Sequence, residues 1–264
     1  MNKDNTIRHI DYHCHILKEY FEDPVLRLQE LKDSGGLECV VSMGLAYESD
    51  CELLALREEL ADPFLKIGVG LHPSEVIKLG SYARHEYGRI AQLIKERVHE
   101  IDYIGEIGID FTYPDAEKYR DEQVQIFKEL CVLARTMSKP VSIHARQAVQ
   151  EVMEVIDTVG FTCEQDNGFI HSFTGTSDEG IFFLERGFRL GLNGIITFKK
   201  SEELRETVRN ILDQYPEKQF NELFGLETDT PYLSPEPVRN KKNTPQHIKY
   251  IAEFINGNIL TWES

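Results

Sequence analysis

The amino-acid sequence predicts a (β/α)8 barrel formed by a single domain over residues 1–264. Three observations support this prediction. Eight short apolar runs are spaced along the chain, polar-apolar segments with helical periodicity lie between them, and chemically reactive side chains recur at the same end of the runs. Strands that alternate with helices over about 250 residues are typical of this barrel. A doubly wound open sheet is the alternative.

The eight predicted strands are short runs of apolar residues with polar residues or turn signals around them. In chain order they are "IRHIDYH" (7–13), "LECVVSMG" (37–44), "FLKIGVGLH" (64–72), "IDYIGEIGID" (101–110), "KPVSIHA" (139–145), "NGFIHSF" (167–173), "FRLGLNG" (188–194) and "LFGLETD" (223–229). Strands of a parallel sheet are buried on both faces, so near-continuous apolar runs are the expected pattern.

Two of the intervening segments show helical spacing most clearly. They are "DEQVQIFKELCVLARTM" (121–137) and "AVQEVMEVIDTVG" (148–160), and the second ends in Gly160, a residue that commonly stops a helix. The sequence contains neither a low-complexity linker nor a repeat of similar residues. One barrel domain is therefore the expected organisation.

Composition indicates a globular protein without a membrane partner. Hydrophobic residues make up 41% of the chain, and charged residues make up 28%. There is no stretch of about 20 apolar residues that would span a membrane, and the N-terminus lacks the apolar run of a signal peptide. Five cysteines, without a CxxC spacing, favour a reducing compartment. We expect a cytoplasmic protein and favour a monomer.

The net charge of −16, from 29 basic and 45 acidic residues, restricts the possible partners. Broad binding of duplex nucleic acid depends on neutralising phosphates, which an acidic surface does not do. An acidic protein that acts on nucleic acid needs bound cations and a local basic patch. A small-molecule substrate has no such requirement.

Candidate metal-binding side chains follow the predicted strands. His13 and His15 are two residues apart, so they project from the same face of a strand. Further candidates occur at or just past the ends of later runs: His72, Glu106, His144, His171 and Asp229. In a (β/α)8 barrel the carboxyl ends of the strands form the active face, where these side chains would meet.

Seven nitrogen or oxygen ligands exceed the needs of one tetrahedral zinc ion, which takes three protein ligands and a water. Two metal ions need about five or six ligands, including a bridging carboxylate. Glu106 is the natural bridge, because Gly105 and Gly108 leave the backbone around it open. Asp229 could serve as a ligand and accept a proton from water. Taken singly, each of these residues also fits a purely structural role: a polar strand end, a salt-bridged acid or a hydrogen-bonded core histidine.

Basic residues near the predicted mouth are candidates for contact with an anionic substrate. Arg146 follows His144 by two residues and could hold an anionic group, or lie on the surface at a helix start. Lys241 and Lys242 belong to the loop "RNKKN" after the last strand, and Lys199 follows the seventh strand. Loops after strands 7 and 8 often bind phosphate in barrels, although charged loops are usually just solvated.

Six motifs, in this order, resemble the TatD family of metal-dependent deoxyribonucleases in the amidohydrolase superfamily. They are "DYHCH", "GLHP", "GEIGID", "IHAR", "HSFTGT" and "ETDTPYL", and the resemblance runs from residue 7 to about 250. It implies a two-metal site whose ligands are His13, His15, Glu106, His144, His171 and Asp229. It further implies that Glu106 bridges the metals, that Asp229 also acts on the nucleophilic water, and that His72 contacts substrate.

The resulting hypothesis is a two-metal hydrolase of phosphodiester bonds, acting as a 3′–5′ exonuclease on single-stranded DNA. Its cofactors would be Zn, Mn, Fe or Mg ions, of which Mg is less typical of mixed imidazole and carboxylate ligands. The alternatives are hydrolysis of a small phosphoester, ester, amide, lactone or aminoacyl ester, and a metal-binding scaffold without turnover. Relatives usually carry a further C-terminal helix, whereas this chain ends in "NGNILTWES", where Trp262 is expected to pack on the last helix.

Overall fold

Eight parallel strands form one sheet in the order β1 to β8 in the computed structural model, which describes residues 6–261. The strands are β1 (Ile10–Cys14), β2 (Cys39–Met43), β3 (Leu65–Val69), β4 (Tyr103–Asp110), β5 (Val141–Arg146), β6 (Gly168–Ile170), β7 (Phe188–Leu192) and β8 (Phe224–Leu226). Each strand pairs in parallel with the next one along the chain. The predicted barrel is therefore confirmed, and the open doubly wound sheet is wrong.

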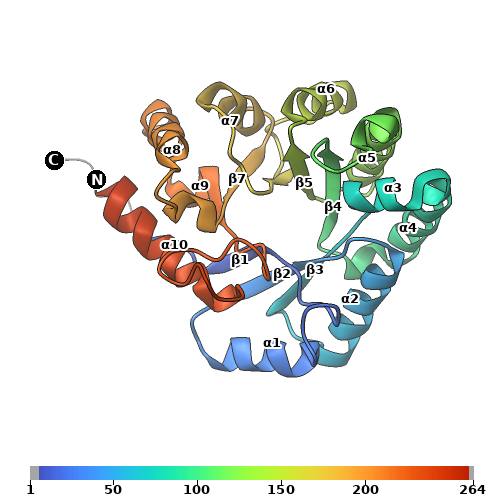
Figure 1. The fold of residues 1–264 in the computed structure, drawn as a ribbon, viewed down its shortest axis with the longest axis horizontal. Coiled ribbons are helices and arrows are strands. Elements are labelled where there is room, and N and C mark those ends of the chain that lie inside the picture. Colours follow the sequence, from blue (N-terminus) through green and yellow to red (C-terminus); the bar gives the residue numbers. More distant parts are fainter. Residues whose placement is uncertain (1–5, 262–264) are drawn as a thin grey trace.

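Helices follow the strands and surround the sheet (Figure 1). They are α1 (Pro24–Asp33), α2 (Tyr47–Leu60), α3 (Pro73–Leu79), α4 (Ala83–Arg97), α5 (Arg120–Thr136), α6 (Val149–Val159), α7 (Ser177–Leu184), α8 (Glu202–Gln214), α9 (Phe220–Leu223) and α10 (Ile248–Ile255). The two helices predicted from periodicity correspond to α5 and α6. Gly160 ends α6 at a φ of 79°, a left-handed conformation that glycine adopts without steric cost.

The core lies between the sheet and the helices. Buried strand residues such as Val40, Val69 and Ile143 belong to the same apolar cluster as Phe127 of α5 and Ile251 of α10. Each of these five side chains is at most 1% exposed. Burial on both faces of the sheet explains why the strands read as apolar runs in the sequence.

The seam between β8 and β1 is closed by hydrogen bonds just beyond β8. The backbone N–H of Asp229 donates to the carbonyl of His13 at 2.8 Å. The side chain of Asp11 accepts from the backbone N–H of Thr228 at 2.8 Å and from its hydroxyl at 2.5 Å. These contacts place the segment that carries Asp229 against the strand that carries the first two histidines.

Within residues 6–261, no helix is both long enough and apolar enough to cross a membrane. The predicted packing of Trp262 on the last helix lies outside the described residues. Inside them, α10 buries Ile248, Ile251 and Ile255 in the core, and Ile259 in the following turn is also buried.

Candidate metal centre

Five of the six predicted metal ligands gather around the sixth, the carboxylate of Glu106. One oxygen of this carboxylate, Oε2, lies 3.2 Å from Nε2 of His13 and 3.6 Å from Nε2 of His15. The other oxygen, Oε1, lies 2.9 Å from Nδ1 of His144 and 3.8 Å from Nε2 of His171. The two oxygens of Glu106 therefore face two different sets of imidazoles.

Asp229 completes the cluster from the opposite side. Its Oδ1 lies 3.5 Å from Nε2 of His15 and 3.8 Å from Nε2 of His171. Three groups of ligand atoms lie within 4.8 Å of one another: His13, His15 and Asp229; His13, Glu106 and His171; His72, Glu106 and His144. Imidazole nitrogens and carboxylate oxygens are donors suited to divalent metal ions.

Glu106 lies in the middle of β4, which corrects the expectation that it ends the fourth strand. The strand continues four residues further and ends at Asp110. A register shift between Ile104 and Ile107 interrupts the pairing with β5 at this point. Gly108 allows close approach of the two strands, since a Cβ there would lie 1.9 Å from the carbonyl oxygen of His144. The close packing of β4 on β5 beside Glu106 thus depends on Gly108.

Hydrogen bonds on the outer nitrogens of His13 and His15 orient both rings. Nδ1 of His15 lies 3.0 Å from the carbonyl oxygen of Met43, which can only accept a hydrogen bond. His15 must therefore carry its proton on Nδ1, and the lone pair of Nε2 faces the cluster. Nδ1 of His13 lies 2.9 Å from the hydroxyl oxygen of Ser142, so its Nε2 also faces the cluster.

Carboxylates hold the other two imidazoles in the same way. Nε2 of His144 lies 2.9 Å from Oδ2 of Asp110, which leaves Nδ1 toward Glu106. Nδ1 of His171 lies 3.0 Å from Oε1 of Glu227, which leaves Nε2 toward the cluster. Metal-bound histidines usually donate their other N–H to a carboxylate or carbonyl, which raises ligand basicity. The rings of His15 and His144 thus fit divalent metal ions in tautomer as well as position, and the rings of His13 and His171 fit them in position.

His72 differs from the other four histidines in the direction of its proton. Its Nδ1 accepts a hydrogen bond from the backbone N–H of Ser74 at 3.1 Å. A neutral His72 therefore carries its proton on Nε2, the nitrogen that lies 3.4 Å from Oε1 of Glu106. In this state the ring presents a hydrogen-bond donor to the cavity, and a metal ion would find no lone pair there.

Burial and charge act against each other in this cluster. Burial raises the pKa of Glu106, but the imidazoles of His72 and His13 outweigh it and lower the pKa well below its ordinary value. Burial lowers the pKa of His171, but the carboxylates of Glu227 and Asp229 outweigh it and raise the pKa to about 10. The carboxylates are therefore ionised at neutral pH, and positive charge at the cluster stabilises them.

A cavity of about 690 Å³ opens above the cluster at the carboxyl ends of the strands. Among the described residues that line this cavity, the lysine and arginine side chains are those of Lys78 and Arg146. Lys199, Lys241 and Lys242 are exposed and do not line this cavity. Of the predicted basic contacts, the structure thus places Arg146 at the cluster and the three lysines outside the cavity.

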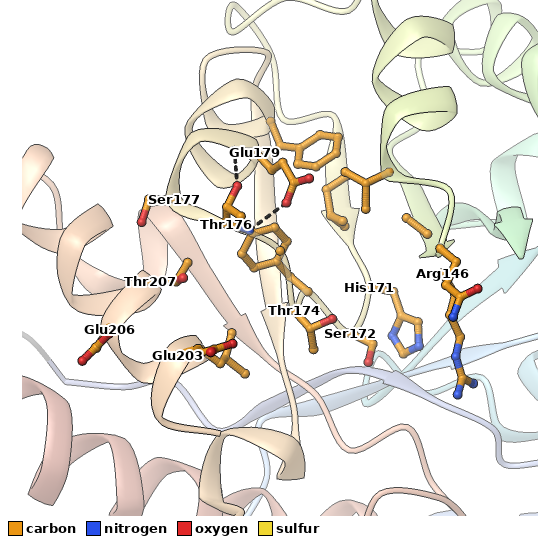
Figure 2. Close-up of a pocket in the computed structure, with 18 of the residues that line it drawn as sticks. Arg146, His171, Ser172, Thr174, Thr176, Ser177, Glu179, Glu203, Glu206 and Thr207 are labelled. Carbon is orange, nitrogen blue, oxygen red and sulfur yellow. Dashed lines mark hydrogen bonds between the residues drawn. The ribbon is translucent and has the colours of Figure 1, made fainter. Parts of the chain in front are cut away.

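A second cavity, of about 670 Å³, extends from the first one toward α8. The two share Arg146, His171, Ser172 and Thr174 among their lining residues. Figure 2 shows His171 and Arg146 at one end of the second cavity and the acidic side chains of α8 at the other. These acidic side chains are Glu203 and Glu206, both exposed.

Sequence reasoning missed several residues of the site. Asp110 lies four residues after Glu106, so the strand period places both on one face, and this spacing was an available signal. Lys78 and Tyr113 carry no local signal, because they reach the cavity from α3 and from the loop after β4. Tyr232 follows Asp229 by three residues, but proximity in sequence alone does not show that a side chain lines a cavity.

The comparisons with known proteins agree with this architecture. The family model described as TatD related DNase matches residues 10–259. The chain is 28% identical over 246 residues to an uncharacterized metal-dependent hydrolase of Bacillus subtilis, covering 93% of this chain and 89% of that protein. It is 30% identical over 254 residues to a similarly named hydrolase of Buchnera aphidicola from Acyrthosiphon pisum, covering 94% of this chain and 90% of that protein.

Solved structures show the same fold. A crystal structure of a TatD homologue from Escherichia coli superposes with a TM-score of 0.77 at 22% identity, covering 94% of this chain and 89% of that one. The fold, the cluster and the relatives define a metal-dependent hydrolase built on a (β/α)8 barrel. The chain belongs to the TatD family.

Proposed function

We propose that this hydrolase cleaves phosphodiester bonds at the ends of single-stranded DNA, in the 3′–5′ direction, with two divalent metal ions. The division of the two Glu106 oxygens between two sets of imidazoles carries the proposal. A carboxylate that faces two ligand sets suits a bridge between two cations. Two-metal sites are typical of nucleases and phosphatases.

The ligand sets follow from the two sides of Glu106. His13, His15 and Asp229 would hold one ion with Oε2 of Glu106, and His144 and His171 would hold the other with Oε1. Metal ions bound there would supply positive charge that polarises the phosphoryl group and eases deprotonation of water. Zn, Mn or Fe suits this donor set better than Mg.

The chain's own side chains would perform the remaining steps. Burial raises the pKa of Asp229, but His15 and His171 outweigh it and lower the pKa, so the carboxylate is ionised and can accept the proton of the attacking water. Nε2–H of His72 would donate a hydrogen bond to a phosphoryl oxygen. Arg146, at the junction of the two cavities, would hold a second phosphoryl oxygen.

The second cavity supports an exonuclease mode. A terminal nucleotide placed beside Arg146, at the junction of the two cavities, would keep its base in the first cavity and point its sugar toward the hydroxyl groups of Ser172 and Thr174. Further along, Glu203 and Glu206 would repel the phosphate of any additional nucleotide. A strand would therefore have to end inside this cavity.

Hydrolysis of a small ester, amide or lactone is the second candidate. It is favoured by the net charge of −16 and by a cavity whose described lining has two basic side chains, Lys78 and Arg146. The same cluster could direct water at a carbonyl carbon.

One experiment separates the two candidates. Metal-replete protein is incubated with single-stranded DNA labelled at either end, with circular single-stranded DNA, and with a panel of esters, amides and lactones. We expect release of mononucleotides from the 3′ end, loss of activity on chelation, and recovery on adding back Zn or Mn. Turnover confined to the carbonyl substrates would contradict the nuclease proposal, and rapid cleavage of the circle would contradict the exonuclease mode.

A further inference from the structure

Two exposed tyrosines line the metal cavity. Tyr113 is 39% exposed and Tyr232 is 51% exposed, and both are among the large hydrophobic side chains that stay exposed in the described chain. An aromatic ring exposed at the rim of a cavity is available to a ligand.

The two rings lie on opposite sides of the mouth. Tyr113 is in the loop after β4, and Tyr232 follows β8. In a barrel with consecutive strand order, β4 and β8 are four strands apart and so face each other across the axis. Glu106 of β4 and Asp229 after β8 each lie within 3.8 Å of the same two imidazoles, those of His15 and His171. A substrate whose reacting group lies at Glu106 therefore has one tyrosine on each side.

Tyr232 is held in place before any substrate arrives. Its backbone N–H donates to the carbonyl of Asp229 at 2.8 Å, and the side chain of Asn243 donates to its carbonyl at 2.5 Å. Its hydroxyl donates to the hydroxyl of Tyr20 at 3.2 Å, and the two rings meet edge to face with centroids 5.9 Å apart. A ring positioned in this way loses little conformational freedom on binding.

The cavity has few basic side chains, so the aromatic rings offer a way to bind a strand that does not rely on its phosphates. Nζ of Lys78 lies 2.5 Å from Oε1 of Glu75. Of the lysine and arginine side chains among the described lining residues, this leaves Arg146 without a carboxylate partner. A protein with a net charge of −16 cannot hold a DNA strand mainly through its phosphates. Stacking of a base on an aromatic ring does not depend on the charge of the protein and tolerates any base.

We propose that Tyr113 and Tyr232 each stack on one of the two nucleobases that flank the scissile phosphate. The site then recognises a single-stranded dinucleotide step by its bases, and a duplex is excluded because its bases are already stacked and paired. This inference rests on the proposed function, since it takes the substrate to be DNA.

The test measures binding and turnover separately. Dissociation constants of metal-replete protein are measured for a short thymidine oligonucleotide with phosphorothioate linkages and for the same strand with abasic sugars beside the central linkage. The variants are Tyr113→Ala, Tyr232→Ala and Tyr232→Phe. Tyr82→Ala is the matched control, because Tyr82 is 72% exposed and lies outside the cavity.

We expect each alanine variant to weaken binding of the thymidine strand about fivefold to a hundredfold, as loss of one stacked base predicts. The preference for the thymidine strand over the abasic strand should shrink by the same factor, and Tyr232→Phe and Tyr82→Ala should keep it. Equal affinity of the native protein for both strands would overturn the inference even if DNA is cleaved. Base-dependent binding without cleavage would instead contradict the proposed function and leave the stacking intact.

Discussion

At the scale of single residues, Glu106 is the side chain on which the cluster depends. We predict that Glu106→Gln folds normally but loses turnover by at least about a hundredfold, because a neutral amide cannot bridge two cations as a carboxylate does. Elemental analysis should show metal content falling from two ions per chain toward one. Glu75→Gln is the matched control, since Glu75 lines the same cavity without contacting the imidazoles. Near-native rates in Glu106→Gln would rule out the bridging role.

The pairing of His171 with Glu227 predicts how the stability of the metal-free protein depends on pH. Glu227 and Asp229 raise the pKa of His171 from 6.5 to about 10 against the opposing effect of burial. A raised histidine pKa stabilises the fold fully below pH 6.5, and this contribution is lost as the pH rises toward 10. The melting temperature of chelated protein should therefore fall across this interval.

Glu227→Gln tests the origin of that dependence. Without the carboxylate, His171 loses the partner that keeps it protonated, so the melting temperature should change less between pH 6.5 and 10. Glu253→Gln on α10 removes the same charge from an exposed position and should leave the pH dependence unaltered. Parallel curves for native protein and Glu227→Gln would show that this pair does not control it.

At the scale of structural elements, the seam between β8 and β1 holds Asp229, just after β8, against the strand that carries His13. Asp11, 0% exposed, accepts hydrogen bonds from the backbone and hydroxyl of Thr228. Asp11→Ala leaves these buried donors without a partner, which should lower the free energy of unfolding by about 2–4 kcal/mol in urea titrations. Thr228→Val removes the hydroxyl alone and should cost about 1 kcal/mol. Equal losses in the two variants would contradict a seam held mainly by the Asp11 carboxylate.

Helix α8 provides the acidic end of the second cavity. If Glu203 and Glu206 exclude further phosphates, the double variant Glu203→Gln/Glu206→Gln should cleave circular single-stranded DNA several-fold faster relative to linear DNA. Asp213→Asn/Glu217→Gln makes the same change in net charge away from this cavity and should not alter the ratio. An unchanged ratio in both double variants would mean that another feature sets the exonuclease mode.

At the scale of the whole molecule, the charge of −16 predicts a weak salt dependence of substrate binding. We propose that a strand leaving the cavity crosses the predicted phosphate contacts Lys199, Lys241 and Lys242, all exposed outside it. Lys241→Ala/Lys242→Ala should then raise the Michaelis constant several-fold and flatten the log–log salt slope by about 0.7 per lost phosphate contact. The rate at saturation should change little.

The control for this experiment removes Lys95 and Lys128, which belong to α4 and α5 on the outside of the barrel. It makes the same change in net charge, so a general field effect would flatten both slopes equally. An unchanged slope in Lys241→Ala/Lys242→Ala would instead favour a small, uncharged substrate.

The sequence by itself determined the features that depend on local spacing. The apolar runs predicted the eight strands, because a strand buried on both faces needs a continuous apolar stretch. The period of two placed His13 and His15 on one face, and Gly160 marked the end of α6. These properties follow from backbone geometry over a few residues.

Only the tertiary structure decided which groups meet across the barrel. The oxygens of Glu106 face different histidines, because hydrogen bonds from other segments orient the rings of His13, His15 and His144. Tyr113 and Tyr232 line one cavity although they are 119 positions apart in the sequence. Contacts between distant segments depend on how the strands curve around the barrel and bring their loops together. No local pattern of residue types encodes that arrangement.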